Sequence, residues 1–213
     1  MALQQVRALE GDGFLAIWQV DAPAAEMMAA LELQPADLER LQGIRHELGQ
    51  QQWLGARLAL KHVLQRQPRV VYDQWGGPHL EAGDYHISIS HSAQQVVVLG
   101  HPTAGVGVDL QYLNPKIERI AQKFMHPAEL HDVARLQNRL HGLHVYWSAK
   151  EALYKWYGRK RVDFREHLAL DAFEQGASGT LSGRIALPGH KSAHTLRYEW
   201  LDESVLVYVF KDY

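Results

Sequence analysis

The sequence contains no cysteine, and this absence removes several chemistries at once. Without thiols the chain can form no disulfide, hold no metal through thiolates and use no cysteine nucleophile. Long hydrophobic runs are missing too: nothing comes near the roughly 18 apolar residues of a spanning helix, and the first residues, MALQQVRALEGDG, lack the apolar core of a signal peptide. We therefore expect a soluble, cytoplasmic protein that does not contact membranes.

An excess of charge of one sign is also missing. The 213 residues carry 22 Lys and Arg against 24 Asp and Glu, a formal net charge of −2. A chain without a global basic field is not expected to bind nucleic acid, so any recognition of an anion must depend on local clusters. Hydrophobic residues make up 46% of the chain, which is enough for a buried core.

Patterns of period two and period 3.6 both occur, which indicates an α+β fold. In the first part of the chain, a predicted strand is followed by a helical stretch that ends at Pro68, and then by further strands. The predicted ranges are a strand at 14–20, helices within 24–67 (one opening at 35–41, another over 51–67), and strands at 70–74, 85–92 and 93–100.

The second part repeats this order after a junction predicted at 101–105. Its ranges are a short buried strand at 105–110, helices within 115–140 and at 143–157, and strands in 167–173, 179–187, 194–201 and 204–210. The pattern is compatible with two similar α+β halves, residues 1–104 and 105–213, although no sequence repeat supports their similarity.

The helix predicted at 143–157 has two different faces. One is an apolar stripe at steps of three and four, formed by Tyr146, Ala149, Leu153, Trp156 and Tyr157. The other arc carries Trp147, Lys150, Glu151, Tyr154 and Lys155. This arc is either an ordinary solvated face, with an i,i+4 pair worth about 0.2–0.5 kcal/mol, or a carboxylate between two ammonium groups that meets a polyanionic ligand.

A second motif, GVGVDL at 105–110, places Asp109 at the end of a buried strand. An aspartate there can simply initiate the turn that follows. Alternatively, it is a hard oxygen ligand for Mg²⁺, completed by Glu151 some forty residues later and by substrate phosphates.

Together these motifs resemble the paired signature of the 4′-phosphopantetheinyl transferases. The signature matches G-V-D (107–109), F-M-H-P-A-E (124–129) and W-S-A-K-E-A-L-Y-K (147–155). In the first half, I-S-I-S-H-S (87–92) is similar to the Ser-His phosphate motif of the family, and W-L-G-A-R-L-A-L-K (53–61) to its basic helix. The resemblance spans about residues 50–155, and the chain length fits the monomeric, surfactin-type branch.

The resemblance implies both a fold and an activity. The fold is a pseudo-dimer of two similar α+β halves, each a mostly antiparallel sheet packed with helices, with the active cleft between the halves. Such enzymes transfer the phosphopantetheine arm of coenzyme A to a serine of an acidic apo acyl or peptidyl carrier protein and release 3′,5′-ADP. They depend on Mg²⁺, for which Mn²⁺ can substitute.

By the same resemblance, Asp109 and Glu151 hold Mg²⁺, with Gln111 at the position of a third ligand. Glu151 is also the expected general base for the serine of the carrier. Lys155 is expected to bind the pyrophosphate near the leaving oxygen, and Lys150 to bind phosphate or to support the carrier site.

The first half supplies contacts to coenzyme A in this scheme. Ser90 and His91 are expected to bind its phosphates, and Arg57 and Lys61 the region of its 3′-phosphate. Simpler interpretations stay open, since His91 can be a satisfied histidine between strands. Arg57 and Lys61 can likewise be solvent-facing helix charges.

Two positions depart from the family pattern. Many surfactin-type members carry an acidic residue where this chain has Gln111, whose amide oxygen is a poorer Mg²⁺ ligand. The family also often has Gly-Lys-Pro before the Ser-His strand, whereas this chain reads G-G-P (76–78), so Gly77 offers no ammonium group.

A basic run follows the helix and includes Arg159, Lys160 and Arg161. Together with Lys155 it can dock an acidic carrier protein on a chain of net negative charge. It can also be a charged loop that ends the helix, where cations are favoured.

Two rival functions remain. HGLH (141–144) and HPAELH (126–131) suggest a metal-dependent hydrolase, but neither is an H-E-x-x-H motif. The other rival is a non-catalytic homologue that binds coenzyme A or a carrier protein, which Gln111 and Gly77 favour. The presence of Asp109 and the charged residues of 150–155 argues against it.

Overall fold

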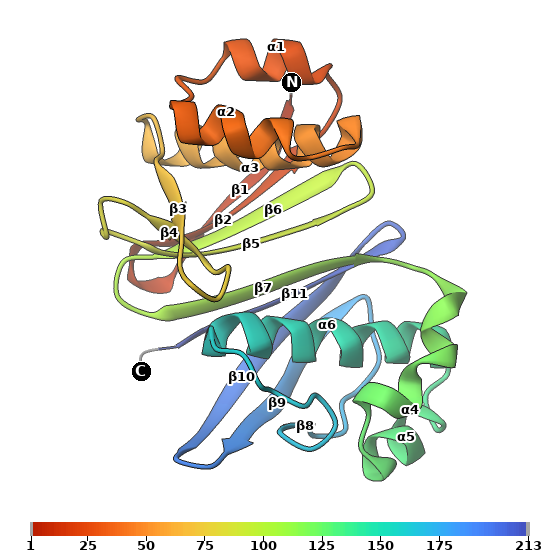
Figure 1. Ribbon diagram of the computed structural model, residues 1–213. Helices are drawn as coiled ribbons and strands as arrows, with labels where there is room; N and C mark the ends of the chain where they lie inside the picture. The colour runs from red at the N-terminus through yellow and green to blue at the C-terminus, as the bar shows by residue number, and fades with distance from the viewer. Residues whose placement is uncertain (1, 212–213) are drawn as a thin grey trace. The chain divides into compact units, whose positions relative to one another are not determined.

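The computed structural model describes residues 2–211 and divides into two compact units, one up to Thr103 and one from Ala104 onward (Figure 1). Each unit has its own buried apolar core. Each also combines an antiparallel sheet with helices, which confirms the α+β class predicted from the sequence.

The first unit is built on a four-stranded antiparallel sheet in the order β1-β2-β6-β5. The bounds of its strands are β1 (Ala2–Leu9), β2 (Gly13–Gln19), β5 (His86–Ser92) and β6 (Gln95–His101), with a separate hairpin of β3 (Val70–Tyr72) and β4 (Pro78–Leu80). Its helices are η1 (Glu10–Asp12), α1 (Ala24–Ala29), α2 (Pro35–Gln42) and α3 (Glu47–Leu64).

Helix α3 is the central helix of this unit because its apolar side chains pack on β2 and β6. Gly55 permits this close packing, since a Cβ there would lie 3.1 Å from the Trp18 ring and 3.3 Å from Val96. Strand β1 was not predicted: its sequence, ALQQVRAL, contains two glutamines and an arginine and is largely exposed, so it shows no clear alternation.

The second unit has a five-stranded antiparallel sheet in the order β7-β11-β10-β9-β8. Its strands are β7 (Gly105–Tyr112), β8 (Leu168–Leu170), β9 (Ser178–Leu187), β10 (His190–Leu201) and β11 (Ser204–Lys211). Its helices are η2 (Pro115–Arg119), α4 (Ala121–Phe124), α5 (Pro127–Val133) and α6 (Arg139–Tyr157).

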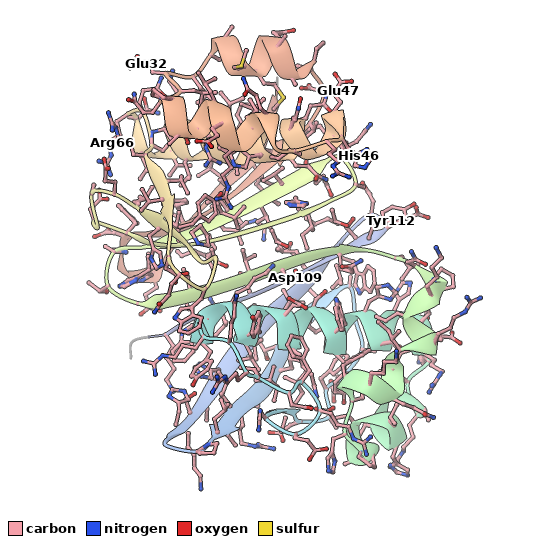
Figure 2. All side chains as sticks on the ribbon, viewed as in Figure 1. Glu32, His46, Glu47, Arg66, Asp109 and Tyr112 are labelled. Carbon is pink, nitrogen blue, oxygen red and sulfur yellow. The ribbon has the colours of Figure 1, made fainter. Side chains whose placement is uncertain are left out.

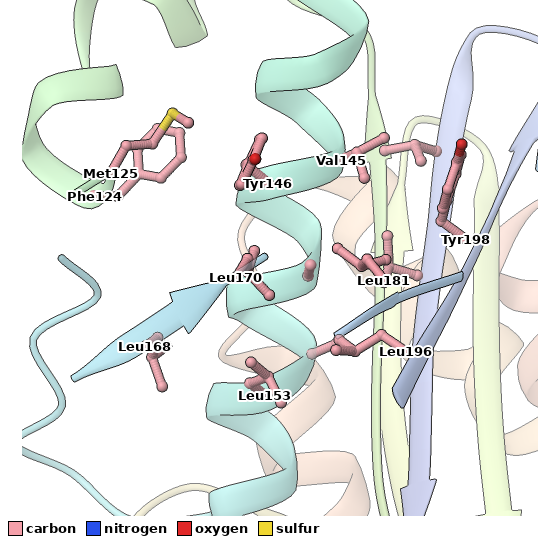
Figure 3. Close-up of a cluster of buried hydrophobic side chains, with 14 of the residues drawn as sticks. Phe124, Met125, Val145, Tyr146, Leu153, Leu168, Leu170, Leu181, Leu196 and Tyr198 are labelled. Carbon is pink, nitrogen blue, oxygen red and sulfur yellow. The ribbon is translucent and has the colours of Figure 1, made fainter. Parts of the chain in front are cut away.

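The apolar stripe predicted on the long helix is the part of α6 that enters the core. Tyr146, Ala149, Leu153 and Trp156 are all buried there, and Figure 3 shows Tyr146 and Leu153 among side chains from α4 and the sheet. Helix α6 packs mainly on β7 and β11. The sheet and α6 therefore form one layered core in this unit.

Helix boundaries in the second unit differ from those predicted. The stretch 115–140, predicted to be helical, contains three short helices, with Pro115 and Pro127 in the first turns of η2 and α5. Helix α6 begins four residues before the predicted start, where Asn138 Oδ1 accepts a hydrogen bond from the His141 N–H. It ends at Gly158, which adopts the left-handed conformation (φ 68°).

Across residues 2–211, no helix is both long enough and apolar enough to cross a bilayer.

Candidate functional site

The candidate site begins where β7 touches α6 in the second unit. Gly107 has no side chain at this contact, and a Cβ there would lie 2.0 Å from the backbone oxygen of Ala152. Side chains alternate along a strand, so Asp109 and Gln111 point to the same face as Gly107, the face that α6 covers. The glycine thus allows α6 to approach, and the next residues on that face meet the charged arc of the helix.

Asp109 and Lys155 form an ion pair across this contact. The Lys155 ammonium group donates to Asp109 Oδ1 at 2.8 Å and to the backbone oxygen of Val108, also at 2.8 Å. The Asp109 side chain is 8% exposed and that of Lys155 is 26% exposed. Figure 2 labels Asp109 on β7 beside α6. The pair places one negative and one positive charge at the same partly buried point.

Glu151 belongs to the same electrostatic group. Its pKa is raised to about 7, first because burial disfavours the charged form and second because the Asp109 carboxylate repels it, while Lys155 acts in the opposite direction. The structure therefore brings Asp109 of β7 together with Glu151 and Lys155 of α6, which follow it by more than forty residues in the sequence. A carboxylate with a pKa near neutrality can accept or release a proton at physiological pH.

Gln111 lies two residues beyond Asp109 on the same face of β7. It is partly buried, and its side-chain amide donates a long hydrogen bond (3.4 Å) to the backbone oxygen of Tyr112. Its side chain supplies a neutral amide where a carboxylate would carry charge.

Lys150, in contrast, is fully buried. Its ammonium group donates to Glu129 Oε2 at 2.7 Å and to the backbone oxygens of Phe124 and Phe164, both at 2.8 Å. Burial lowers the pKa of Lys150, and the Glu129 carboxylate partly opposes this. Three N–H groups meet three acceptors, so none is left here for a phosphate.

Glu129 is a buried residue of this region whose role the sequence does not indicate. It is 3% exposed and also accepts the N–H groups of His126 (2.8 Å) and Leu170 (2.9 Å). The available signal was the H-P-A-E sequence, in which Glu129 is placed to cap the first turn of α5. Nothing in the sequence connects it to Lys150, because that contact is tertiary.

A pocket of about 570 Å³ opens beside Glu151 within the second unit. Aromatic side chains form much of its wall: the Trp147 ring packs edge-on against Phe124 (5.0 Å between centroids) and tilts against Phe164 (5.8 Å). The lining residues are Ile120, Lys123, Phe124, Trp147, Glu151, Tyr154, Arg161, Val162, Asp163 and Phe164. The pocket thus combines apolar walls with two carboxylates, those of Glu151 and Asp163, and two exposed cations, those of Lys123 and Arg161.

The basic run after α6 is exposed at Arg159, Lys160 and Arg161. Arg161 adopts a positive φ of 69°, which is uncommon for a non-glycine residue, and it lines the pocket. The run therefore includes one residue that faces the candidate site and two exposed cations next to it in the chain.

In the first unit, the two predicted ligands of the 3′-phosphate make contacts within the unit. Arg57 is 2% exposed, stacks on the Trp53 ring (3.1 Å to the centroid) and lies 3.7 Å from Asp37. Burial lowers the pKa of its guanidinium. Lys61 donates to the backbone oxygen of Ala30 at 2.8 Å. These contacts connect α3 to α2 and α1; Arg57 is buried, whereas Lys61 is partly exposed.

Ser90 and His91 lie on β5, with Ser90 buried and His91 exposed. Gly77 lies in the turn of the β3–β4 hairpin, at the position where the family often has lysine. Asp73 shapes the turn, because its Oδ1 accepts the N–H groups of Trp75 (2.7 Å) and Gly77 (2.8 Å). Hydrogen bonds from His79 and these backbone groups hold the pKa of Asp73 below its usual value.

The histidines that suggested a hydrolase have structural partners. His144 is buried between the backbone oxygen of Leu140 (2.9 Å) and the N–H of Asn114 (3.0 Å), which occupies both ring nitrogens. The His126 ring caps α5, and the His141 ring packs on Trp200 at 4.1 Å. Within the described part of the chain, no three His, Asp or Glu side chains gather as a metal site.

Comparison with known proteins agrees with this geometry. Residues 105–209 match the profile of the 4′-phosphopantetheinyl transferase superfamily. The chain is also similar to the 4′-phosphopantetheinyl transferases AcpT of Salmonella typhi and of Salmonella typhimurium, with 27% identity to each over 123 residues. The match covers 55% of this chain and 62% of the length of each relative.

The profile covers β7 and α6, the two elements that hold Asp109, Glu151 and Lys155. The matched region thus contains both carboxylates and the ammonium group of the candidate site. By sequence match and by the placement of these residues, residues 105–209 are similar to the 4′-phosphopantetheinyl transferase superfamily.

Proposed function

We propose that the protein transfers the 4′-phosphopantetheine arm of coenzyme A to a serine of an apo acyl or peptidyl carrier protein and releases 3′,5′-ADP, in the manner of the monomeric, surfactin-type branch. One observation carries this proposal: β7 and α6 bring Asp109, Glu151 and Lys155 together in the unit that matches the superfamily. Two carboxylates and an ammonium group are the charges that transfer from a pyrophosphate requires.

The residues present fit Mg²⁺. Asp109 and Glu151 offer hard carboxylate oxygens. Burial, followed by repulsion from Asp109, raises the pKa of Glu151, so a nearby cation would stabilise its charged form. Asp109 and Glu151 would hold the ion, with Gln111 in reach as a neutral third ligand. When bound, Mg²⁺ supplies positive charge that neutralises pyrophosphate oxygens.

Glu151 has a second role in the proposal, as general base. Its carboxylate would take the proton of the carrier serine as the serine oxygen attacks phosphorus. Lys155, held at Asp109, brings positive charge to the same place and stabilises the pyrophosphate oxygen that leaves with 3′,5′-ADP.

The partner is proposed to be an acidic carrier protein that docks on Arg159, Lys160 and Arg161. These three side chains are exposed, and Arg161 lines the pocket beside Glu151. Reversing all three to glutamate should raise the KM for the carrier at least tenfold and leave the Kd of coenzyme A unchanged, because charge pairs at a docking surface govern association. A loss of coenzyme A affinity instead would show that the run binds the nucleotide.

The deciding experiment measures the transfer itself. The protein is incubated with coenzyme A, Mg²⁺ and several apo carrier proteins, and intact mass shows whether the carrier gains the phosphopantetheine arm. We expect the addition with wild type, and its loss with Glu151→Gln, which keeps the shape of the side chain but can neither be a base nor carry charge. Omission of the metal should abolish it as well.

A second candidate function rests on Gln111 and Gly77, which weaken the metal site and the phosphate site relative to the family pattern. In this alternative the protein binds coenzyme A or a carrier without turnover. Coenzyme A binding by calorimetry, with no mass added to any carrier tested, would favour the binding protein over the enzyme.

A further inference from the structure

We propose that Lys150 is a positioning residue that holds the aromatic wall of the pocket beside Glu151. An effect of Lys150 on catalysis depends on the proposed function, whereas the contacts of Lys150 described below do not. Lys150 precedes Glu151 in α6, and its side chain is fully buried and does not line the pocket.

The partners of Lys150 connect three separate segments. The Phe124 oxygen lies at the end of α4 and the Phe164 oxygen in the irregular stretch after α6, so both carbonyl groups lie where helix geometry supplies no regular donor. Figure 3 shows Phe124 at the end of α4 beside α6. Lys150 therefore ties the end of α4 and the 158–167 stretch to one point on α6.

Both tethered residues also line the pocket. The rings of Phe124 and Phe164 both pack on Trp147, which is one turn before Lys150 on the same helix. The two hydrogen bonds from Lys150 to backbone oxygens thus fix the positions of Phe124 and Phe164. The third aromatic residue of the wall, Trp147, lies on α6, as Lys150 does. The width of the pocket beside Glu151 depends on these contacts.

Glu129 keeps the ammonium group in place. Its carboxylate accepts Lys150 and also the N–H groups of His126 and Leu170, so it connects α5 and β8 to the same point. Buried ion pairs are inefficient for stability, because apolar residues of similar volume often do as well or better. The Lys150–Glu129 pair is therefore better explained by the position it gives to the pocket wall.

The test asks whether Lys150 affects only the stability of the fold, or also the order of the pocket wall and the rate of phosphopantetheine transfer. Lys150→Met removes the donors but leaves Glu129 buried without its cation, so this variant is expected to be less stable. The double variant Lys150→Met with Glu129→Gln removes both charges and should recover much of the melting temperature. If Lys150 positions the wall, the pocket wall of the double variant should still be less ordered than in wild type.

Hydrogen exchange reads the pocket directly and does not depend on activity. The amides to follow are those of Lys123, Met125 and His167, which donate to Ile120, Ala121 and Asp163. We expect their exchange to be at least tenfold faster in the double variant, while amides in the β9–β10 ladder keep their wild-type rates. Unchanged exchange at all three amides would overturn the proposal.

Transfer kinetics provide the second readout. In the double variant we expect kcat to fall at least tenfold with the Kd of coenzyme A changed less than threefold, since Lys150 contacts no substrate. Leu196→Ala is the control: it opens a cavity in the same core outside the pocket lining, and it should lower stability without a comparable loss of kcat.

Equal loss of kcat in this control and in the double variant would reduce Lys150 to a stabilising residue. If wild type transfers nothing, the proposed function fails, while the exchange experiment still decides the role of Lys150.

Discussion

At the scale of single residues, the site depends on how burial changes the chemistry of ordinary side chains. Glu151 is a common residue on a common helix, yet partial burial and the nearby Asp109 carboxylate raise its pKa to about 7. Lys155 counters part of that repulsion through its bond to Asp109. The site thus contains two carboxylates and one ammonium group, so a single added charge should have a measurable effect.

Gln111→Glu adds that charge. The new carboxylate would lie on the same face of β7 as Asp109, and a third negative ligand strengthens the hold on a divalent cation. We expect the Kd for Mg²⁺ to fall about tenfold, equivalent to roughly 1.4 kcal/mol, as measured by calorimetry. Gln122→Glu makes the same charge change at an exposed position on α4 and should leave the Kd unchanged. An unaltered Mg²⁺ dependence in Gln111→Glu would show that position 111 is not a ligand.

His194 makes a separate prediction, about stability. It is 4% exposed in β10, packs on the Trp156 ring, and has His190 and Lys211 as charged or titratable neighbours. Burial, followed by the charges of Lys211 and His190, lowers its pKa from 6.5 to about 4. Between these values the unfolded chain binds a proton that the folded chain does not. The free energy of unfolding should therefore fall as the pH drops from 6.5 towards 4, by about 2–3 kcal/mol from this residue.

Denaturant titrations at a series of pH values test this prediction. His194→Gln should flatten the slope of stability against pH in that window, whatever its effect on absolute stability. His131→Gln, at an exposed position, is the matched control and should keep the wild-type slope. Identical slopes in all three proteins would mean that His194 does take up its proton in the folded state.

At the scale of elements, the site is a contact between one strand and one helix. The close approach of β7 and α6 depends on Gly107, where a Cβ would lie 2.0 Å from the Ala152 oxygen and 2.9 Å from the Trp156 nitrogen. Both obstacles are backbone atoms, which cannot rotate away as a side chain does. The spacing of the two elements also sets the positions of Asp109 and Glu151.

Gly107→Ala should therefore affect stability and the site together. We expect a loss of about 3 kcal/mol of stability and at least a tenfold weaker Mg²⁺ affinity, because the helix must move away from the strand. Gly176→Ala is the control, since its Cβ would be 3.2 Å from the Ser178 oxygen in a loop and should cost far less. Chemical denaturation and metal titration measure the two effects. A fully stable Gly107→Ala protein would contradict the packing argument.

The elements differ in how well the sequence predicts them. Helix α6 and strands β5, β6 and β7 were predicted because their apolar periodicity is strong over several residues. Strand β1 was not, because ALQQVRAL pairs with β2 while leaving most of its side chains exposed. The start of α6 was placed late because the cap at Asn138 lies outside the periodic stretch.

The site follows the same logic. The types of its residues could be predicted from the two motifs, but not their surroundings. Lys150 and Lys155 look equivalent on a helical wheel; one is fully buried against Glu129, 21 residues earlier in the chain, and the other is partly exposed at Asp109. Arg57 likewise looks like a surface charge and is buried on Trp53. Tertiary packing decides these cases, and local sequence does not record it.

At the scale of the whole molecule, each unit has its own sheet and its own core, and the two carry different parts of the proposed function. The carboxylates and Lys155 belong to the second unit, whereas the residues predicted to bind coenzyme A phosphates, Ser90 and His91, belong to the first. Their role remains a prediction. Arg57 and Lys61 make contacts inside the first unit. His91 is therefore the more important residue to test for binding of a coenzyme A phosphate.

His91→Ala tests whether the first unit contributes to coenzyme A binding. If His91 binds a phosphate, its loss should weaken the Kd of coenzyme A about tenfold, roughly 1.4 kcal/mol, while the Kd for Mg²⁺ alone stays at the wild-type value. His86→Ala provides a matched control, because His86 is also an exposed histidine of β5 but lies five residues away and so on the opposite face of the strand. Calorimetry with coenzyme A and with Mg²⁺ separates the outcomes. Equal affinities in both variants would remove His91 from the site, and a parallel loss of Mg²⁺ affinity would mean that the substitution acts on the second unit and not on the nucleotide.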